Sequence, residues 1–257
     1  MSKKAIVTGA GHGIGKTIAI ELAKAGYDVG ITYSGSSVEQ INDTLERILA
    51  AGQKGYIERM DLTDAANIKP AMDALTASLG GLDVLVNNAG ATKFVPFIDV
   101  TIDQFDQLMS IDYRGTYFCA QYAARHMIAH GVKGVIINIA SVHVYYNFPK
   151  ASIYAPNKAA VEKLTQHIAL ELAPYGIRCN SVSPGYIKVT DPDSVPAREK
   201  MMVSRIPAQR IGQPVEIANM IRFLISDEAE YITGSDFLVD GGARLPALLD
   251  NVYVKQE

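Results

Sequence analysis

The sequence contains a serine, a tyrosine and a lysine whose types and spacing suit acid–base chemistry: Ser141, Tyr154 and Lys158. Tyr154 and Lys158 are four residues apart, so within one helix both side chains would lie on the same face. The ammonium group of the lysine would favour the phenolate form of the tyrosine, which makes a usable acid or base near neutral pH. The hydroxyl of Ser141 could hydrogen-bond the same reacting oxygen. Because tyrosine and lysine occur at this spacing by chance in many helices, the remaining sequence decides the interpretation.

The elements around these residues follow from the hydrophobic pattern. Residues 134–140 form a short apolar run that predicts a buried strand, with Ser141 at its carboxyl end. A long helical pattern begins at Tyr154 and continues to about Tyr175. Pro156 is tolerated only in the first turn of a helix, which supports a helix start at Tyr154.

A glycine-rich turn, TGAGHGIG, connects a predicted first strand at residues 5–7 to a helical pattern that ends at Gly26. Glycines at such a turn let the backbone approach a pyrophosphate, whose charge the helix N-terminus stabilises. The same glycine-rich segment, taken alone, could equally be a simple tight turn with a glycine cap. The flanking strand and helix favour nucleotide binding. The predicted contacts are Gly9, Gly11, His12, Gly13, Ile14 and Gly15.

The end of the second predicted strand, residues 29–33, bears on the choice between NADP and NAD. A site for NAD usually has an acidic residue here that binds the ribose 2′-hydroxyl, whereas this chain has Tyr33. No carboxylate is present to repel a 2′-phosphate and no arginine to attract one. We predict NADP, with NAD possible, and contacts from Tyr33, Ser34, Ser36 and His12; turn chemistry explains each serine equally well.

Two further predicted strands, residues 55–60 and 82–86, also end in candidate cofactor contacts. After the first, Asp61 could reach an adenine amino group, and Thr63 is a candidate cap for a helix over residues 65–79. After the second, small residues leave room for a flat ligand, while the asparagines could bind neighbouring backbone or ligand hydroxyls. The predicted contacts are Asp61, Leu62, Asn88, Ala89 and Gly90.

The alternation of strands and helices continues through a helix at 102–131, a strand at 177–182, a helix at 215–224 and a strand at 237–239. It predicts an α/β fold: one doubly wound Rossmann-type domain over residues 1–257, with a parallel sheet of about seven strands and helices on both faces. Ligands bind such sheets at the carboxyl ends of the strands, so Thr8, Asn87, Ser141 and Pro184 are expected at one edge. Residues 188–207 are expected to cover the substrate, and the apolar tail 243–257 to pack on its own subunit or a neighbour.

The composition limits the classes of function. Of the 257 residues 20% are charged and 48% hydrophobic, and the net charge of −3 without a basic block argues against nucleic acid or a membrane as partner. Cys119 and Cys179 lack metal-ligand spacing, so we expect core residues in a reduced compartment and no metal site. With neither a signal peptide nor a membrane-span length of apolar residues, we expect a cytoplasmic protein.

Taken in order, these motifs resemble those of the short-chain dehydrogenase/reductase family over residues 4–242. The set Thr8-Gly9-x3-Gly13-Ile14-Gly15, Asn87-Asn88-Ala89-Gly90, Ser141, Tyr154-x3-Lys158 and Pro184-Gly185 is far more specific than any one member. Within the family, the run Ala140-Ser141-Val142-His143, Pro149 and the apolar tail are similar to bacterial glucose 1-dehydrogenases and related sugar or polyol dehydrogenases.

The resemblance implies the following roles. Tyr154 would protonate or deprotonate the substrate oxygen, Lys158 would assist it and bind the nicotinamide ribose, and Ser141 would orient the substrate. Cofactor contacts would extend to Tyr154, Lys158, Pro184, Gly185 and Ile187. The two long helices would form the family's usual subunit contacts, so a homotetramer is expected. Lys93 and Arg114 are predicted on solvated or subunit-contact surfaces.

Two positions depart from the family's pattern. Asp112, three residues before Gly115, stands where the family commonly has an asparagine that helps to hold a water for proton relay. An aspartate could still accept hydrogen bonds from Lys158 and a water, so Asp112 is a candidate catalytic residue. We predict that Asp112→Asn keeps activity and shifts its pH dependence. Val189 stands where a threonine is usual, so the backbone of Ile187 is predicted to carry more of the contact with the nicotinamide carboxamide.

We therefore predict an NADP-preferring oxidoreductase that transfers a hydride between NADP(H) and a secondary alcohol or ketone, with a sugar or polyol as its small-molecule substrate. A β-ketoacyl carrier-protein reductase, or another ketoreductase, is the alternative among enzymes. It would be favoured by a basic patch for the acidic carrier, and the sequence shows no dense one. A catalytically silent NADP-binding sensor is the alternative from another class. His143 could line the substrate pocket and is given no catalytic role.

Overall fold

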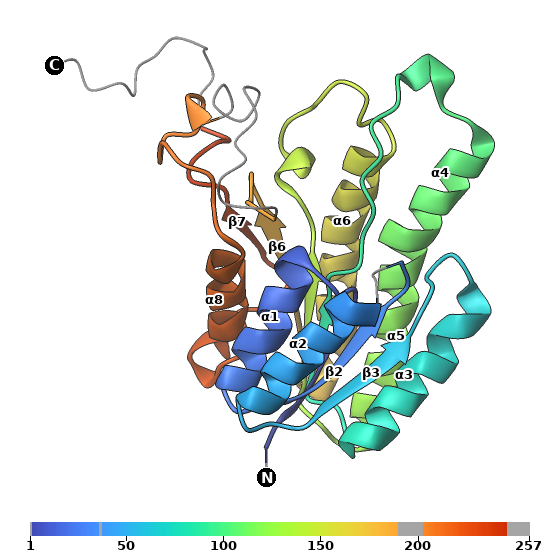
Figure 1. The fold of residues 1–257 in the computed structure, drawn as a ribbon, viewed down its shortest axis with the longest axis vertical. Helices are drawn as coiled ribbons and strands as arrows, with labels where there is room; N and C mark the ends of the chain where they lie inside the picture. The colour runs from blue at the N-terminus through green and yellow to red at the C-terminus, as the bar shows by residue number, and fades with distance from the viewer. Residues whose placement is uncertain (1, 36–37, 190–202, 246–257) are drawn as a thin grey trace, which may run out of the picture.

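The structure, a computed structural model, describes residues 2–35, 38–189 and 203–245 (Figure 1). Within these ranges the strands form one parallel sheet in the order β3-β2-β1-β4-β5-β6-β7. Their bounds are β1 Lys4–Val7, β2 Asp28–Tyr33, β3 Gly55–Arg59, β4 Val84–Asn87, β5 Val135–Ile139, β6 Arg178–Pro184 and β7 Asp236–Val239. The strand order reverses between β1 and β4, so the carboxyl ends of these two strands mark the switch point of the sheet.

The central strands are apolar on both faces, as a sheet covered by helices on each side requires. Successive residues of β1, β4 and β5 alternate between two separate core clusters. Val7, Val86 and Ile137 face one helical layer, and Ile6, Leu85 and Ile136 face the other. The predicted α/β fold with a doubly wound parallel sheet is confirmed.

Helices cover both faces of this sheet (Figure 1). One layer consists of α1 Gly13–Lys24, α2 Val38–Ala50 and α8 Pro214–Leu224, and the other of α3 Ala65–Leu79, α5 Thr116–Ala129 and α6 Tyr154–Leu172. Pro156 lies in the first turn of α6, as predicted. Shorter helical segments are η1 Phe97–Asp99, α4 Ile102–Leu108, η3 Val142–Val144, η4 Ala173–Tyr175 and η5 Asp227–Ala229.

The helix predicted over residues 102–131 is interrupted by a π-helix, Met109–Gly115, between α4 and α5. Two contacts with other elements accompany this irregular segment. The carboxylate of Asp112 accepts a hydrogen bond from the backbone N–H of Ala91, and Leu62 packs where a Cβ of Gly115 would lie, 2.7 Å away. Sequence periodicity does not reveal this change of helix type, because the contacts come from residues distant in the chain.

Parts of two predicted segments lie outside the described residues: 190–202 of the substrate-covering segment and 246–257 of the tail. In the part of the tail that is described, the guanidinium of Arg244 lies 4.6 Å from the ring centre of Tyr145. Within the described ranges, no helix combines the length and apolar character needed to cross a membrane.

Candidate active site

A cavity of about 580 Å³ lies at the carboxyl ends of β1, β2, β3 and β4, across the switch point of the sheet. It brings together predicted cofactor residues from four separate turns: Gly9, His12, Gly13, Ile14, Gly15, Tyr33, Ser34, Asp61, Leu62, Asn88, Ala89 and Gly90. Sequence reasoning missed other lining residues, namely Thr32, Gly35, Met60, Ala91, Thr92 and Ile111. Most of these residues are neighbours of a predicted motif in the sequence. The motifs therefore identified the turns that line the cavity, but not every lining residue in each turn.

The glycine-rich turn packs directly against the turn after β4. Gly9 has a φ of +66°, and a Cβ at this position would lie 2.8 Å from the Cα of Ala89. A Cβ on Gly15 would overlap the carboxamide of Asn88 and the carbonyl of Gly9. Only glycine permits both the backbone conformation at Gly9 and the close approach at Gly15.

Side chains of Thr8 and Asn88 hold the two turns together. The Thr8 hydroxyl oxygen accepts hydrogen bonds from the backbone N–H groups of Asn88 and Ala89, each at 3.0 Å. The Asn88 amide donates to the carbonyls of Thr8 and Gly9, also at 3.0 Å. The Asn87 amide donates to Asn138 at 2.9 Å. Of the two roles considered for these asparagines, the structure shows the binding of neighbouring protein groups.

The cavity fits a dinucleotide. Helix α1 begins beside it, and the side chain of the preceding residue, His12, does not cap the helix, so N–H groups at the helix N-terminus can bind a phosphate. The glycines let a ligand approach the backbone, and Ala89 and Gly90 leave room for a flat ring. The residues present therefore suit a pyrophosphate flanked by two aromatic bases.

The loop after β3 differs from the prediction in two details. Asp61 accepts hydrogen bonds from the backbone N–H and the hydroxyl of Thr63, at 2.9 and 2.7 Å, and these bonds hold the pKa of Asp61 below its usual value. Thr63 is thus not the cap of α3; Asp64 caps it by accepting from Ala66 at 3.0 Å. Arg114 is not merely a surface residue, because its guanidinium donates to the Thr63 carbonyl at 2.7 Å.

Tyr154 and Lys158 lie on the first turns of α6 and do not line the dinucleotide cavity, which Lys158 approaches at Gly90. The Lys158 side chain is buried, and its Nζ donates to the carbonyl of Ile139, the last residue of β5, at 2.9 Å. The same Nζ lies 5.8 Å from the centre of the Tyr154 ring. The predicted i, i+4 arrangement on one helix face is therefore present.

The buried carboxylate of Asp112 approaches the same point from the π-helix. Its Oδ1 accepts from the Ala91 N–H at 2.8 Å. A Cβ on Gly90 would lie 3.1 Å from this oxygen and 3.3 Å from Lys158 Nζ, so both charged groups converge on Gly90. Burial raises the pKa of Asp112, and this effect outweighs the lowering by Lys158, the Ala91 N–H and Asn157.

Ser141 is buried at the end of β5, and its hydroxyl oxygen accepts from the backbone N–H of His143 at 3.3 Å. The imidazole ring of His143 in turn lies edge-on to the ring of Tyr154, with 5.4 Å between ring centres. His143 lies in the loop 142–153 between Ser141 and Tyr154, and it contacts both residues.

The remaining predicted cofactor residues do not line the described cavity. Gly185 packs against β7, where its N–H donates to the Val239 carbonyl at 2.9 Å, and it directly follows Pro184 at the end of β6. Ile187 forms an isolated β-bridge with Gly212. Val189 does line the cavity and lies 3.4 Å from the Cβ position of Gly13. Gly11 is buried outside the cavity, and Ser36 lies outside the described residues.

Comparison with known proteins gives a consistent assignment. A family described as enoyl-(acyl carrier protein) reductase matches residues 9–244. L-2,3-butanediol dehydrogenase of Corynebacterium glutamicum is 38% identical over 94% of this chain and 98% of its own. The 3-oxoacyl-acyl-carrier-protein reductase FabG of Staphylococcus aureus is also 38% identical, over 94% of this chain and 98% of its own.

Among solved structures, acetoin dehydrogenase YohF of Salmonella typhimurium is 40% identical and superposes with a TM-score of 0.89, covering 95% of this chain and 97% of that one. Near-complete coverage at this identity, together with the shared fold, extends the similarity well beyond the short motifs. The chain belongs to the classical short-chain dehydrogenase/reductase family and is an oxidoreductase that uses NAD or NADP.

Proposed function

We propose that this enzyme transfers a hydride between NADP(H) and a small secondary alcohol or ketone that carries further oxygens, such as a diol, polyol or sugar. The observation that carries the proposal is the convergence of Tyr154, Lys158 and Asp112 beside a dinucleotide cavity, with Ser141 reached through His143. A bound nicotinamide ring supplies or accepts the hydride.

The protein groups manage the proton and the substrate oxygen. In the oxidative direction Tyr154 takes the proton of the substrate hydroxyl while the carbon that bears this hydroxyl loses a hydride. In the reductive direction Tyr154 returns a proton to the carbonyl oxygen. The ammonium of Lys158 lies 5.8 Å from the centre of the Tyr154 ring, and Ser141 hydrogen-bonds the substrate oxygen. Asp112 accepts a hydrogen bond from the Ala91 backbone N–H, and its carboxylate lies with Lys158 Nζ beside Gly90.

The substrate class is supported by two relatives. The names of the butanediol and acetoin dehydrogenases describe small substrates with oxygens on neighbouring carbons. The similarity to FabG favours a second candidate, reduction of a β-ketoacyl carrier-protein substrate. We also propose that the chain forms one catalytic domain.

Preference for NADP is supported by the rim of the cavity at the end of β2. Tyr33 and Ser34 line it, and no carboxylate from this turn lines it among the described residues. Asp61 lines the cavity further on, and one of its oxygens is already bound by Thr63. A 2′-phosphate at the rim would therefore meet Tyr33, Ser34 and, on the other side, His12.

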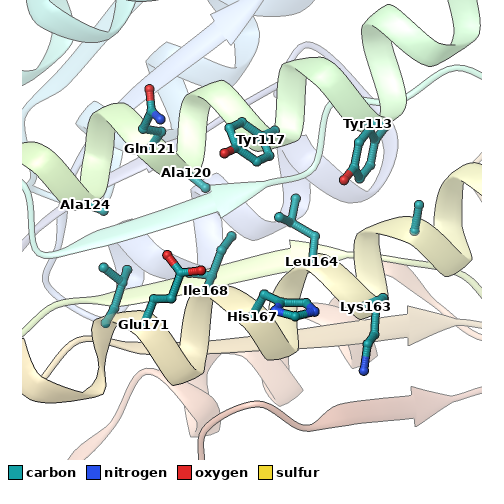
Figure 2. A pocket seen from close by; sticks show the side chains of 12 residues that line it. Tyr113, Tyr117, Ala120, Gln121, Ala124, Lys163, Leu164, His167, Ile168 and Glu171 are labelled. Atoms are coloured by element: carbon teal, nitrogen blue, oxygen red, sulfur yellow. The ribbon is translucent and has the colours of Figure 1, made fainter.

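A homotetramer is supported by a groove of about 550 Å³ between α5 and α6 (Figure 2). Figure 2 shows Tyr113, Tyr117, Ala120, Gln121 and Ala124 on one wall and Lys163, Leu164, His167, Ile168 and Glu171 on the other. The groove combines apolar area with small residues, which lets helices of a second copy pack closely. Ala160→Arg should yield a smaller species in light scattering, whereas Glu46→Arg on α2 should not.

The protein's location is proposed as the cytoplasm. Cys119 and Cys179 are free thiols enclosed in the core, and burial raises the pKa of Cys119 to about 12. Such thiols are inert and suit a reducing compartment.

Nicotinamide absorbance with purified protein tests the proposal. NADP(H) and NAD(H) would each be paired with acetoin, 2,3-butanediol, sugars, polyols and β-keto esters. Faster turnover of diols, polyols or sugars with NADP supports it, and turnover of keto esters alone would transfer support to the β-ketoacyl reductase. Tight cofactor binding without any turnover would instead favour a sensor.

A further inference from the structure

His143 lies in a cluster of aromatic rings beside the predicted acid–base residue. Its ring centre is 5.4 Å from that of Tyr154, 4.9 Å from Phe148, 6.0 Å from Tyr146 and 6.3 Å from Phe94. Among these neighbours the phenylalanines offer no hydrogen-bonding group. The imidazole therefore places two nitrogens within an aromatic cluster that includes the ring of Tyr154.

The two nitrogens of His143 have different surroundings. Nδ1 is enclosed and has no hydrogen-bond partner in the described part of the chain. The residue as a whole is only half-buried, so Nε2 is the ring nitrogen that can meet a ligand. Burial lowers the pKa of His143, which keeps the ring neutral near pH 7 with one N–H group.

Which ring nitrogen carries the hydrogen follows from the free-energy cost of burying an N–H group, compared with that of burying an unprotonated nitrogen, without a hydrogen-bond partner. A buried N–H group without an acceptor is rarer in proteins than a buried acceptor that lacks a donor. The hydrogen is therefore favoured on Nε2, which turns His143 into an uncharged donor directed to a ligand. An uncharged donor recognises an oxygen acceptor such as a hydroxyl or carbonyl group.

We infer that His143 donates a hydrogen bond to a second substrate oxygen, carried by the carbon next to the reacting carbon. The inference rests on the proposed function. The backbone of His143 is bound to the Ser141 hydroxyl and its ring lies against the Tyr154 ring, so the imidazole lies beside both residues that the proposed function assigns to the reacting oxygen. The substrates favoured by this donor are vicinal diols, α-hydroxy ketones and sugars.

Two substrates isolate this contact. Acetoin and 2-butanone share a four-carbon ketone skeleton, and only acetoin has a hydroxyl on the neighbouring carbon. Two variants isolate the donor: His143→Gln keeps an N–H group, whereas His143→Met has a similar unbranched shape without one. The measurement is kcat/KM for each ketone with NADPH, and the quantity compared is the ratio of acetoin to 2-butanone.

We expect wild type to prefer acetoin and His143→Met to lower the ratio by about tenfold or more, as loss of one hydrogen bond to an uncharged donor predicts. His143→Gln should retain most of the ratio. Titration of NADPH fluorescence shows whether each variant binds cofactor, and circular dichroism shows whether it folds. If His143→Met does not fold, His143→Phe replaces it as the variant without a donor.

Equal losses on both ketones, or a ratio unchanged in His143→Met, would overturn the inference and leave the proposed reduction of small ketones intact. Wild type that reduces keto esters but neither acetoin nor 2-butanone would overturn the proposed substrate class together with the inference. The two failures are thus distinguishable in the same assay.

Discussion

The two halves of the active site are built differently. On the dinucleotide side, close backbone packing shapes the cavity: Gly9 and Gly15 lie against the turn that carries Asn88 and Ala89. On the substrate side, buried side chains make the site, with Lys158 and Asp112 meeting at Gly90 and His143 between Ser141 and Tyr154.

This difference predicts two kinds of sensitivity. On the dinucleotide side, a substitution that adds volume should lower stability and NADPH binding, because atoms there are already in contact. On the substrate side, a substitution that changes charge or hydrogen bonding should change turnover and its pH dependence, because buried polar groups lack water to replace a lost partner. Variants on each side test this contrast.

Tyr154→Phe removes one hydroxyl group from the substrate side and should lower kcat by about a thousandfold, since proton transfer loses its donor and acceptor. NADPH binding, measured by fluorescence, should change little. Tyr146→Phe is the matched control in the same aromatic cluster and should cost less than about tenfold. Unchanged turnover in Tyr154→Phe would remove this tyrosine from the mechanism.

Gly9→Ala adds one methyl group to the dinucleotide side. It combines a left-handed backbone with the 2.8 Å approach to Ala89, so we expect the free energy of unfolding to fall by about 3 kcal/mol or more, with loss of NADPH binding. Gly52→Ala is the control, because Gly52 has a φ of +83° with no atom within 4 Å of the added Cβ.

Gly52→Ala should cost about 1 kcal/mol and leave NADPH affinity unchanged. Urea unfolding and fluorescence titration measure both quantities. Equal effects at the two glycines would show that strain alone, and not the packing of the two turns, decides the outcome.

Ser34→Asp places a carboxylate on the rim of the dinucleotide cavity. Repulsion of a 2′-phosphate should lower kcat/KM for NADP by about tenfold, with a much smaller change for NAD. Ser34→Asn has nearly the same shape without the charge and should retain the preference. If Ser34→Asp has no effect on the ratio of NADP to NAD, the 2′-phosphate does not bind at this rim.

Asp112→Asn should have the smallest effect on rate, less than about tenfold, and should shift the pH profile. Because the pKa of Asp112 is raised in the folded protein, its stabilising contribution is present below the usual aspartate pKa and is lost as pH rises through the raised value.

Relative to wild type, Asp112→Asn should therefore gain stability as pH increases. Thermal unfolding of both proteins at about pH 5 and about pH 8 measures this change. A folded but inactive Asp112→Asn enzyme would mean that the carboxylate itself is required for turnover.

Several features were predictable because they depend on local pattern. The glycine turn, the start of α6 at Tyr154 and the shared face of Tyr154 and Lys158 follow from periodicity and from residue preferences within a few positions. The α/β class and the parallel sheet follow from the order of these elements.

Other features were missed because their partners are distant in the chain. Arg114 binds the Thr63 carbonyl across 51 positions, and the Thr8 hydroxyl binds the Asn88 N–H across 80. The cap of α3 is a local exception: Thr63 was expected there, but its hydroxyl is bound to Asp61, and the next residue, Asp64, caps the helix.

Hydrophobic period and backbone preference, both visible along the chain, specify which elements form, in what order, and which turns carry glycine, serine, tyrosine and lysine. The folded arrangement alone shows that Asp112 is buried beside Lys158 in a π-helix and that His143 lies against Tyr154 with one enclosed nitrogen. Burial and hydrogen-bond partners set charge and proton position, and they come from segments that meet only when the chain folds.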